Sequence, residues 1–358
     1  DKDNCFLIKK INMDKNKQFL ENLLKTNTPS GSEHLGMQAF REFCDGFICM
    51  EDKVGNVAYV VGNIDNPKHK ILLSAHIDEI GLRIQYIDDN GFISVIKNGG
   101  VDLKTLLGAR VRILNSKGII HGVIGKAPIH VERRNNTEDK KIELSDIKID
   151  CGFSSKEEAL QHISIGDCVV VDTDPMWLNE NRITGKALDD KVGVYVVGRV
   201  LDELSKAYLK DIAVYGAACT QEETTGNGAA ALIKMINPDT SIDYDVTFAT
   251  DDGFVDAKEW GDVKLGLGGC IVHSPDCNPR LVSKFKEIGD LTHTPYQEFS
   301  VGGGMTNTQT LKKFGFDVDT VLLSIPLRNM HTQVEIADIR DLEALVKLTV
   351  ETIMSLQF

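Results

Sequence analysis

The feature of this chain that most constrains its fold is a change of hydrophobic pattern near residue 81, which reverses near residue 182. Before the change, Ile71–Ala75 is a short, nearly continuous apolar run, typical of a strand buried on both faces of a sheet. Between Gly81 and Asp174, short alternating runs are separated by hairpin-type turn signals at Asp89-Asn90-Gly91 and Ser116-Lys117-Gly118. We therefore predict an α/β domain interrupted by a compact, mostly β unit of about ninety residues.

The α/β pattern is expected to resume after Arg182. It predicts, in order, helix 189–204, strand 212–218, helix 228–236, strand 246–249, helix 308–313, strand 320–325 and helix 339–356. The predicted organisation is a first α/β part at 1–80, an inserted β domain at 81–176 and a second α/β part at 177–358.

Charge and composition exclude several classes of partner. The formal net charge is −13, and such a surface would repel phosphate backbones, so we expect no binding of nucleic acid. No apolar run approaches the roughly 18 residues of a membrane-spanning helix, and Asp1–Met13 lacks the pattern of a signal peptide. The eight cysteines form no Cys-x-x-Cys pair, which favours reduced thiols and a cytoplasmic protein.

Five potential metal ligands follow or begin these elements: His76, Asp189, Glu223, Asp245 and His331. His76 ends the apolar run at 71–75, and ligand sites in open α/β sheets collect beyond the carboxyl ends of strands. The same rule applies to Glu223 and His331, and Asp189 begins a predicted helix at the same edge. Asp245 precedes its predicted strand and fits the rule less well. Two histidines and three carboxylates suit zinc, cobalt or manganese.

Three further acidic residues stand beside these candidates. Glu222 is adjacent to Glu223, and neighbouring side chains point in different directions, so one can bind metal while the other serves as a general base. Either Asp189 or Asp190 could bridge two ions, and we prefer Asp189. Asp78 could orient the imidazole of His76. Each of these residues alone would more often be structural, so the metal interpretation depends on their joint placement.

Six motifs carry a resemblance to the glutamyl and deblocking aminopeptidases, metallopeptidase family forty-two, which includes the self-compartmentalising TET peptidases. They lie in order between Thr28 and Glu335: Pro29-Ser30-Gly31-Ser32-Glu33, Ser74-Ala75-His76-Ile77-Asp78-Glu79-Ile80-Gly81, Ala187-Leu188-Asp189-Asp190, Gln221-Glu222-Glu223, Asp245-Val246-Thr247 and Met330-His331. The resemblance implies a mixed-sheet α/β di-metal aminopeptidase domain (phosphorylase/hydrolase-like) with an inserted small β-barrel, here 81–176, as the dimerisation domain.

The resemblance also implies a site. One metal ion would be held by His76, Asp189 and Asp245, and the second by Asp189, Glu223 and His331. Glu222 would be the general base for a metal-bound water, and Asp78 the orienting carboxylate. It implies two divalent ions per subunit, zinc or cobalt, peptide substrates with a free amino terminus, and a homo-oligomer, as a dimer or a hollow dodecamer.

Two positions depart from the family pattern and bear on side-chain preference. Gly303-Gly304-Met305-Thr306-Asn307 stands where Gly-Gly-Thr-Asp is expected, and Asn329 stands where a tyrosine usually precedes Met-His.

Other functions remain open at this point. A related di-zinc carboxypeptidase or deacylase would use the same ligand types but recognise a substrate carboxylate. A glycosidase would need paired carboxylates without metal, so sensitivity to chelators separates it. A non-catalytic assembly protein with a vestigial site is disfavoured because all five ligands and the base are present.

Overall fold

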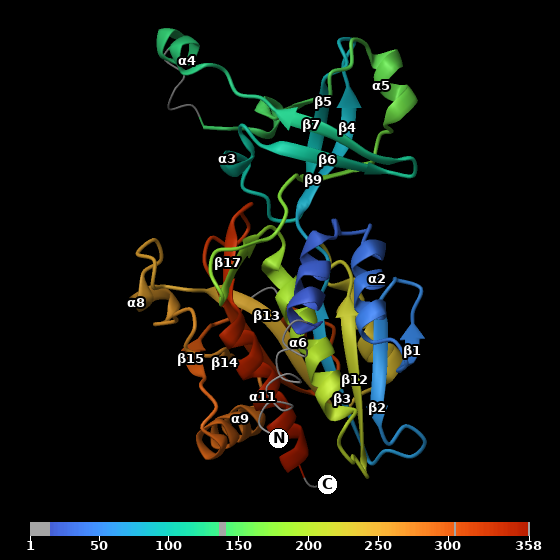
Figure 1. The fold of residues 1–358 in the computed structure, drawn as a ribbon, viewed down its shortest axis with the longest axis vertical. Coiled ribbons are helices and arrows are strands. Elements are labelled where there is room, and N and C mark those ends of the chain that lie inside the picture. Colours follow the sequence, from blue (N-terminus) through green and yellow to red (C-terminus); the bar gives the residue numbers. More distant parts are fainter. Residues whose placement is uncertain (1–14, 136–140, 304–305, 357–358) are drawn as a thin grey trace, which may run out of the picture.

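The computed structural model describes residues 15–135, 141–303 and 306–356. Residues 1–14, where no signal peptide is expected, lie outside this part. The α/β part is built on an eight-stranded mixed sheet (Figure 1). In spatial order its strands are β1 (Ile48–Glu51), β2 (Val57–Gly62), β12 (Ile212–Cys219), β3 (His69–His76), β13 (Thr240–Phe248), β16 (Asp319–Leu327), β14 (Cys270–His273) and β15 (Gln297–Ser300).

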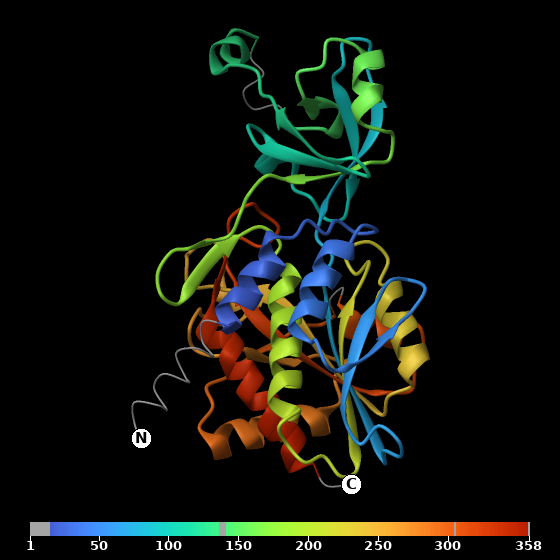
Figure 2. The same ribbon diagram turned by 45° about the vertical axis from the view of Figure 1, so that its right-hand side comes forward.

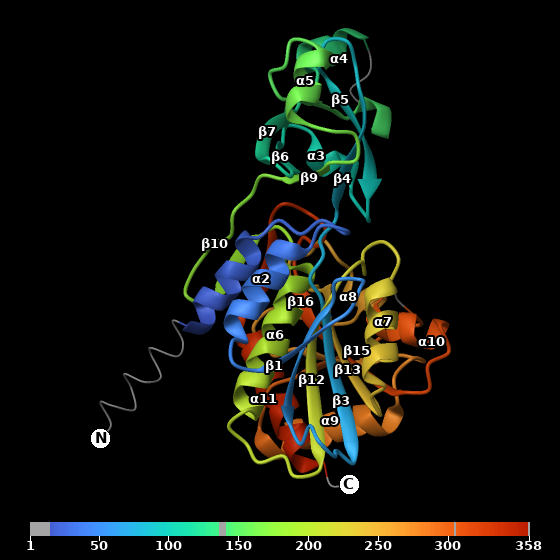
Figure 3. The same cartoon turned by 90° about the vertical axis from the view of Figure 1, so that its right-hand side faces the viewer.

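Helices cover both faces of this sheet (Figure 3). One face carries the helix at residues 15–25 together with α2 (His34–Phe43), α6 (Leu188–Leu204) and α11 (Ile339–Ser355), and the other carries α7 (Asn227–Ile236) and α10 (Asn307–Lys313). α8 (Ala257–Trp260) and α9 (Pro279–Thr292) complete the helices of this part. Because both faces are covered, the central strand β3 reads as an apolar run, with Ile71 and Leu73 fully buried.

The segment between β3 and α6 contains a closed six-stranded barrel, ordered β4-β5-β8-β7-β6-β9, which stands apart from the large sheet (Figure 2). Its strands are β4 (Gly81–Ile87), β5 (Ile93–Asn98), β6 (Arg110–Asn115), β7 (Gly118–Ile124), β8 (Lys148–Asp150) and β9 (Cys168–Val171), with short helices α3 (Leu103–Leu106), α4 (Ile129–Asn135), η1 (Leu144–Asp146) and α5 (Lys156–His162). The barrel has its own apolar core, including Ile84, Ile113 and Val169. The predicted fold class, a mixed α/β domain with an inserted β-barrel, is confirmed.

A small three-stranded sheet joins the two ends of the second α/β part. It consists of β10 (Met176–Trp177), β11 (Arg182–Gly185) and β17 (Glu335–Asp338). Gly185 pairs with Glu335, which brings the chain just before α6 next to the chain that follows β16.

The predicted strand at 246–249 is too short and misplaces Asp245. β13 begins at Thr240, so Asp245 lies within the strand near its carboxyl end. The apolar pattern did not reveal the start of this strand, because the charged residue Asp243 is buried inside it. Ser74, Ser241 and Thr308 donate hydrogen bonds to the Asp243 carboxylate. Asp245 therefore obeys the strand-end rule that we expected it to fit poorly.

No helix of the described residues is both long and apolar enough to cross a membrane.

Candidate metal centre

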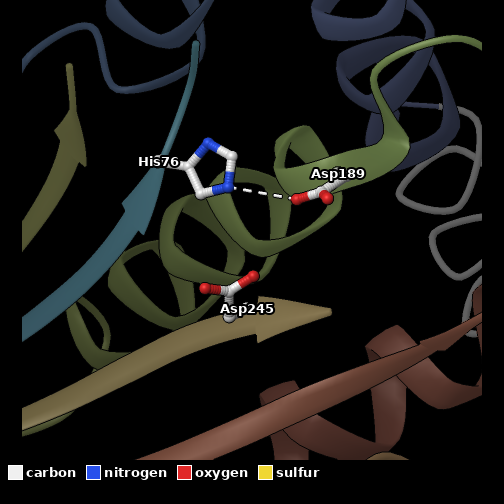
Figure 4. Close-up of side chains that lie close together, drawn as sticks. All are labelled: His76, Asp189 and Asp245. Carbon is white, nitrogen blue, oxygen red and sulfur yellow. Dashed lines mark hydrogen bonds and ion pairs between the residues drawn. The ribbon is translucent and has the colours of Figure 1, made fainter. Parts of the chain in front are cut away.

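Five elements bring the predicted ligands to one edge of the large sheet. His76 is the last residue of β3, Asp245 lies near the end of β13, and Glu223 follows β12. Asp189 is the second residue of α6, and His331 follows β16. Figure 4 shows His76, Asp189 and Asp245 converging from these separate elements. Ligand sites form at this edge because neighbouring parallel strands end there together.

The five side chains form two overlapping groups that could each hold a metal ion. In one group, ligand atoms of His76, Asp189 and Asp245 lie within 4.8 Å of one another, and the same holds for Asp189, Glu223 and His331. Asp189 belongs to both groups. Its Oδ1 lies 3.1 Å from Nε2 of His76, and its Oδ2 lies 3.1 Å from Nε2 of His331. Such spacing is compatible with ligand atoms that share one ion bound at about 2.0–2.2 Å.

Asp190 occupies a different position from Asp189, although the two are adjacent and joined by a cis peptide bond. Oδ1 of Asp190 accepts a hydrogen bond from the backbone nitrogen of Gly193 at 3.0 Å, inside the first turn of α6. Its Oδ2 is buried without a hydrogen-bond partner among the described residues. The geometry thus favours Asp189 over Asp190 as a residue shared by two ions.

The orientation of His76 is set mainly by a backbone carbonyl. Nδ1 of His76 lies 3.0 Å from the carbonyl oxygen of Asp78 and 3.5 Å from its carboxylate. A proton on Nδ1 would leave Nε2 free to bind metal. The Asp78 carboxylate instead accepts hydrogen bonds from the backbone nitrogens of Glu222 and Glu223, at 3.0 and 3.2 Å. Asp78 therefore holds the turn that carries both glutamates.

The charges of the site fit a bound cation. Burial and neighbouring carboxylates raise the pKa values of Glu223 and Asp245 well above the ordinary range. Burial, with the carboxylates of Asp245, Asp78 and Asp189, also raises the pKa of Glu222 to about 8. The hydrogen bond to Asp189 raises the pKa of His331 to about 9. Buried acid groups outnumber imidazoles, and divalent cations would allow all of them to remain ionised.

Glu335 is part of the site but was missed in the sequence. It is 2% exposed. One carboxylate oxygen accepts from the backbone nitrogens of Leu188 and Asp189, and the other accepts from that of His331. The only signal in the sequence was its position, four residues after His331.

Backbone strain gathers around the same residues. Six described non-glycine residues have a positive φ, and four of them flank or belong to the site: Ala187, Gln221, Asn329 and His331. Such conformations cost about 1–3 kcal/mol each and persist where the surrounding structure enforces them, often at functional sites.

A cavity of about 390 Å³ opens beside these groups, and Glu222, Asp245 and His331 line it. Of the positions that depart from the family pattern, Gly303 and Thr306 line the cavity, and Gly304 and Met305 lie outside the described residues. Asn307 begins α10 and donates to Ser74 at 3.5 Å. The Asn329 side chain donates to the carbonyl of Val334 at 3.1 Å.

Known proteins resemble this chain over nearly its whole length. The sequence pattern of M42 glutamyl aminopeptidases matches residues 55–348. A lysyl aminopeptidase of Pyrococcus furiosus is 30% identical over 336 residues, covering 92% of this chain and 94% of that protein. The crystal structure of a TET aminopeptidase from a marine sediment archaeon of the Thaumarchaeota has a TM-score of 0.90 at 27% identity, covering 97% of this chain and 98% of that one. The TET1 peptidase of Pyrococcus horikoshii, described as assembling into a tetrahedron or a large octahedral shell, has a TM-score of 0.85 at 30% identity and covers 95% of this chain and 100% of that one.

Proposed function

The chain belongs to the M42 glutamyl aminopeptidase family and is a peptide hydrolase of the aminopeptidase type; from this premise we propose that it works with two divalent metal ions and with Glu222 as general base. The observation that carries the proposal is the Asp189 carboxylate, whose two oxygens face His76 and His331 at 3.1 Å each.

Two ligand sets are proposed. His76, Asp189 and Asp245 would hold one ion, and Asp189, Glu223 and His331 would hold the other, in agreement with the two groups of neighbouring ligand atoms. Imidazole and carboxylate ligands suit zinc or cobalt. When bound, such ions lower the pKa of water and polarise the scissile carbonyl.

Glu222 is the proposed proton acceptor. Its side chain is 9% exposed and lines the cavity, and its Oε2 lies 4.0 Å from Nε2 of His76. The hydrogen bond from its backbone nitrogen to Asp78 fixes the turn from which it projects. In this position Glu222 can take a proton from the attacking water and return it to the leaving amine.

An amino-terminal substrate fits the cavity better than a carboxy-terminal one. A carboxypeptidase needs a cation to bind the free substrate carboxylate, and no Lys or Arg occurs among the described residues that line the cavity. The carboxylates that line the cavity instead favour the ammonium group of a free substrate amino terminus. The side-chain preference does not follow from the names of relatives, because glutamyl and lysyl substrates need pockets of opposite charge.

We also propose that the inserted segment 81–176 joins subunits into a dimer, and that dimers build a hollow dodecamer. The barrel has exposed apolar side chains that a partner could cover, among them Ile119, Val123 and Ile165, which are 46%, 48% and 56% exposed. Light scattering of the purified protein tests the assembly, and a monomer at micromolar concentration would contradict it.

The test of the activity is a panel of peptides with free and acetylated amino termini, assayed before and after treatment with a chelator. We expect release of single amino-terminal residues from free peptides only, loss of activity with the chelator, and recovery with zinc or cobalt. Equal cleavage of acetylated peptides would contradict the aminopeptidase assignment, and full activity in the chelator would contradict the role of metal.

A further inference from the structure

We propose that the cavity beside the metal centre selects amino-terminal residues with a basic side chain, and that Asp276 receives the cation at its far end. This inference rests on the proposed function, because it places the substrate amino terminus at the metal residues. It adds a substrate class and a specificity residue.

The floor of the cavity runs from the metal residues along the sheet. β13 and β16 are parallel neighbours, and Asp245 pairs with Ser324, so both side chains lie on the same face of the sheet. Leu322 lies on the same face, two residues before Ser324. It is therefore about 6.6 Å further from the metal end of the strand. β14 runs antiparallel beside β16, and Val272 of β14 lines the cavity together with Leu322. The side chain of a substrate residue bound next to Asp245 would therefore extend along the sheet, away from the edge that carries the metal residues.

The walls of this route are apolar. Besides Leu322 and Val272, the lining includes Phe299, Val301, Phe248 and Trp260. The rings of Phe248 and Trp260 pack edge to face, with their centroids 4.9 Å apart. Walls of this kind suit the methylene stem of a long side chain, because lysine and arginine bury their stems along apolar surface and extend the charge beyond it.

The far end of the cavity is anionic. Asp276 lies in the connection between β14 and α9 and lines the cavity. Its backbone is fixed, since its nitrogen donates to Ser274 Oγ at 3.2 Å and its carbonyl accepts from the hydroxyl of Thr320. The carboxylate accepts a long hydrogen bond of 3.4 Å from Ser274 Oγ, and no Lys, Arg or His of the described part of the chain forms an ion pair with it. It can therefore receive a ligand cation.

A buried hydroxyl in the cavity has no hydrogen-bond partner among the described residues. Ser324 is 1% exposed, lines the cavity, and its hydroxyl has no hydrogen-bond partner within the described structure. Buried hydroxyls are normally satisfied, so an orphaned one inside a cavity points to a polar ligand group. An aliphatic amino-terminal residue would leave the Asp276 carboxylate without a cation, and an acidic one would be repelled by it.

The first experiment measures binding without turnover, because the free amino acids lysine and norleucine have no amide bond to cleave. Their side chains have the same number of carbons, but norleucine lacks the side-chain ammonium. Calorimetry on the full-length, metal-loaded protein should show lysine binding at least about tenfold more tightly, and Asp276→Asn should abolish that difference. Equal binding of the two amino acids by the unaltered protein would overturn the inference even if no activity is found.

The second experiment measures selectivity of cleavage with lysyl, arginyl, leucyl and glutamyl anilides. We expect kcat/KM to be highest for the two basic substrates, and Asp276→Asn to lower these by about 10–100-fold while changing the leucyl value less than about threefold. Asp317→Asn is the matched control, because it removes the same charge at an exposed site away from the cavity. A leucyl preference in the unaltered protein, or an equal loss on all four substrates in Asp276→Asn, would overturn the selectivity. Failure of the proposed function looks different, since then none of the four anilides is cleaved.

Discussion

The carboxylate of Glu335 accepts a hydrogen bond from the backbone nitrogen of His331 at 2.8 Å. Its other oxygen accepts from the backbone nitrogens of Leu188 and Asp189, at 2.7 and 3.2 Å. One buried side chain thus fixes the distance between two loops that carry proposed ligands. Glu335 need not touch an ion to affect metal binding, because it sets where Asp189 and His331 lie.

Replacing Glu335 should therefore weaken metal binding more than it changes the fold. We expect Glu335→Ala to lower metal affinity by about 10–100-fold, as for other residues that support ligands, with activity partly restored at high metal concentration. Metal titration followed by activity provides the measurement. Glu287→Gln, at an exposed position on α9, is the control and should bind metal normally. Unchanged affinity in Glu335→Ala would contradict the positioning role.

Asp78 should affect catalysis through the turn of Glu222 and Glu223. In Asp78→Asn, one of the two carboxylate oxygens is replaced by NH₂, which cannot accept a hydrogen bond, so the backbone nitrogen of either Glu222 or Glu223 would lose its acceptor. We expect kcat to fall by about 10–100-fold. Ser30→Ala removes only the hydroxyl that donates to Asp78 at 2.5 Å, so kcat should fall less in Ser30→Ala than in Asp78→Asn. Steady-state kinetics of both variants tests this order, and a larger loss in Ser30→Ala would contradict it.

Glu222→Gln separates proton transfer from metal binding. The amide keeps the size of the side chain but cannot accept a proton, so kcat should fall by about 10²–10⁴-fold. The metal content should remain that of the unaltered protein, because Glu222 is not one of the proposed ligands. Elemental analysis and single-turnover assays check both results. If Glu222→Gln retains full activity, Glu222 is not the base.

Much of this arrangement follows from sequence reasoning. The apolar run before His76 predicts a central strand, and the rule that ligands follow strand ends predicts one shared edge for His76, Glu223 and His331. The turn signals between Gly81 and Asp174 predict a separate β unit, which the structure shows as a closed barrel. These features depend on local patterns, and local patterns are visible in a single chain.

Features that depend on contacts between distant segments could not be predicted. Asp243 interrupts the apolar pattern of β13, and only its partners Ser74 and Thr308, far away in the chain, make its burial possible. Glu335 has no motif, because its role is to accept hydrogen bonds from backbone nitrogens. Asp276 becomes a candidate only when β14 and β16 are seen side by side.

Glu79 lies in the same motif as His76 but belongs to a buried ion cluster that should govern stability. Its Oε2 lies 2.5 Å from Nζ of Lys186, and its Oε1 lies 3.4 Å from Nζ of Lys191. All three side chains are at most 4% exposed. Burial opposes ionisation of Glu79, but the two ammonium groups outweigh it and lower its pKa from 4.5 to about 2.

Because the folded protein holds the Glu79 proton more weakly than the unfolded chain does, ionised Glu79 stabilises the fold fully above about pH 4.5, and this contribution is lost as the pH falls through about 2. Glu79→Gln should therefore lower the free energy of unfolding by about 3–5 kcal/mol at pH 7, since it leaves two buried ammonium groups without their carboxylate. This difference in unfolding free energy should shrink as the pH approaches 2.

Urea unfolding with chelator in every sample measures the free energy of unfolding without a contribution from bound metal. Asp262→Asn breaks the exposed pair with Lys264 and should cost at most about 1 kcal/mol. If Glu79→Gln lowers the free energy of unfolding no more than Asp262→Asn does, the buried cluster contributes no more to stability than a surface ion pair.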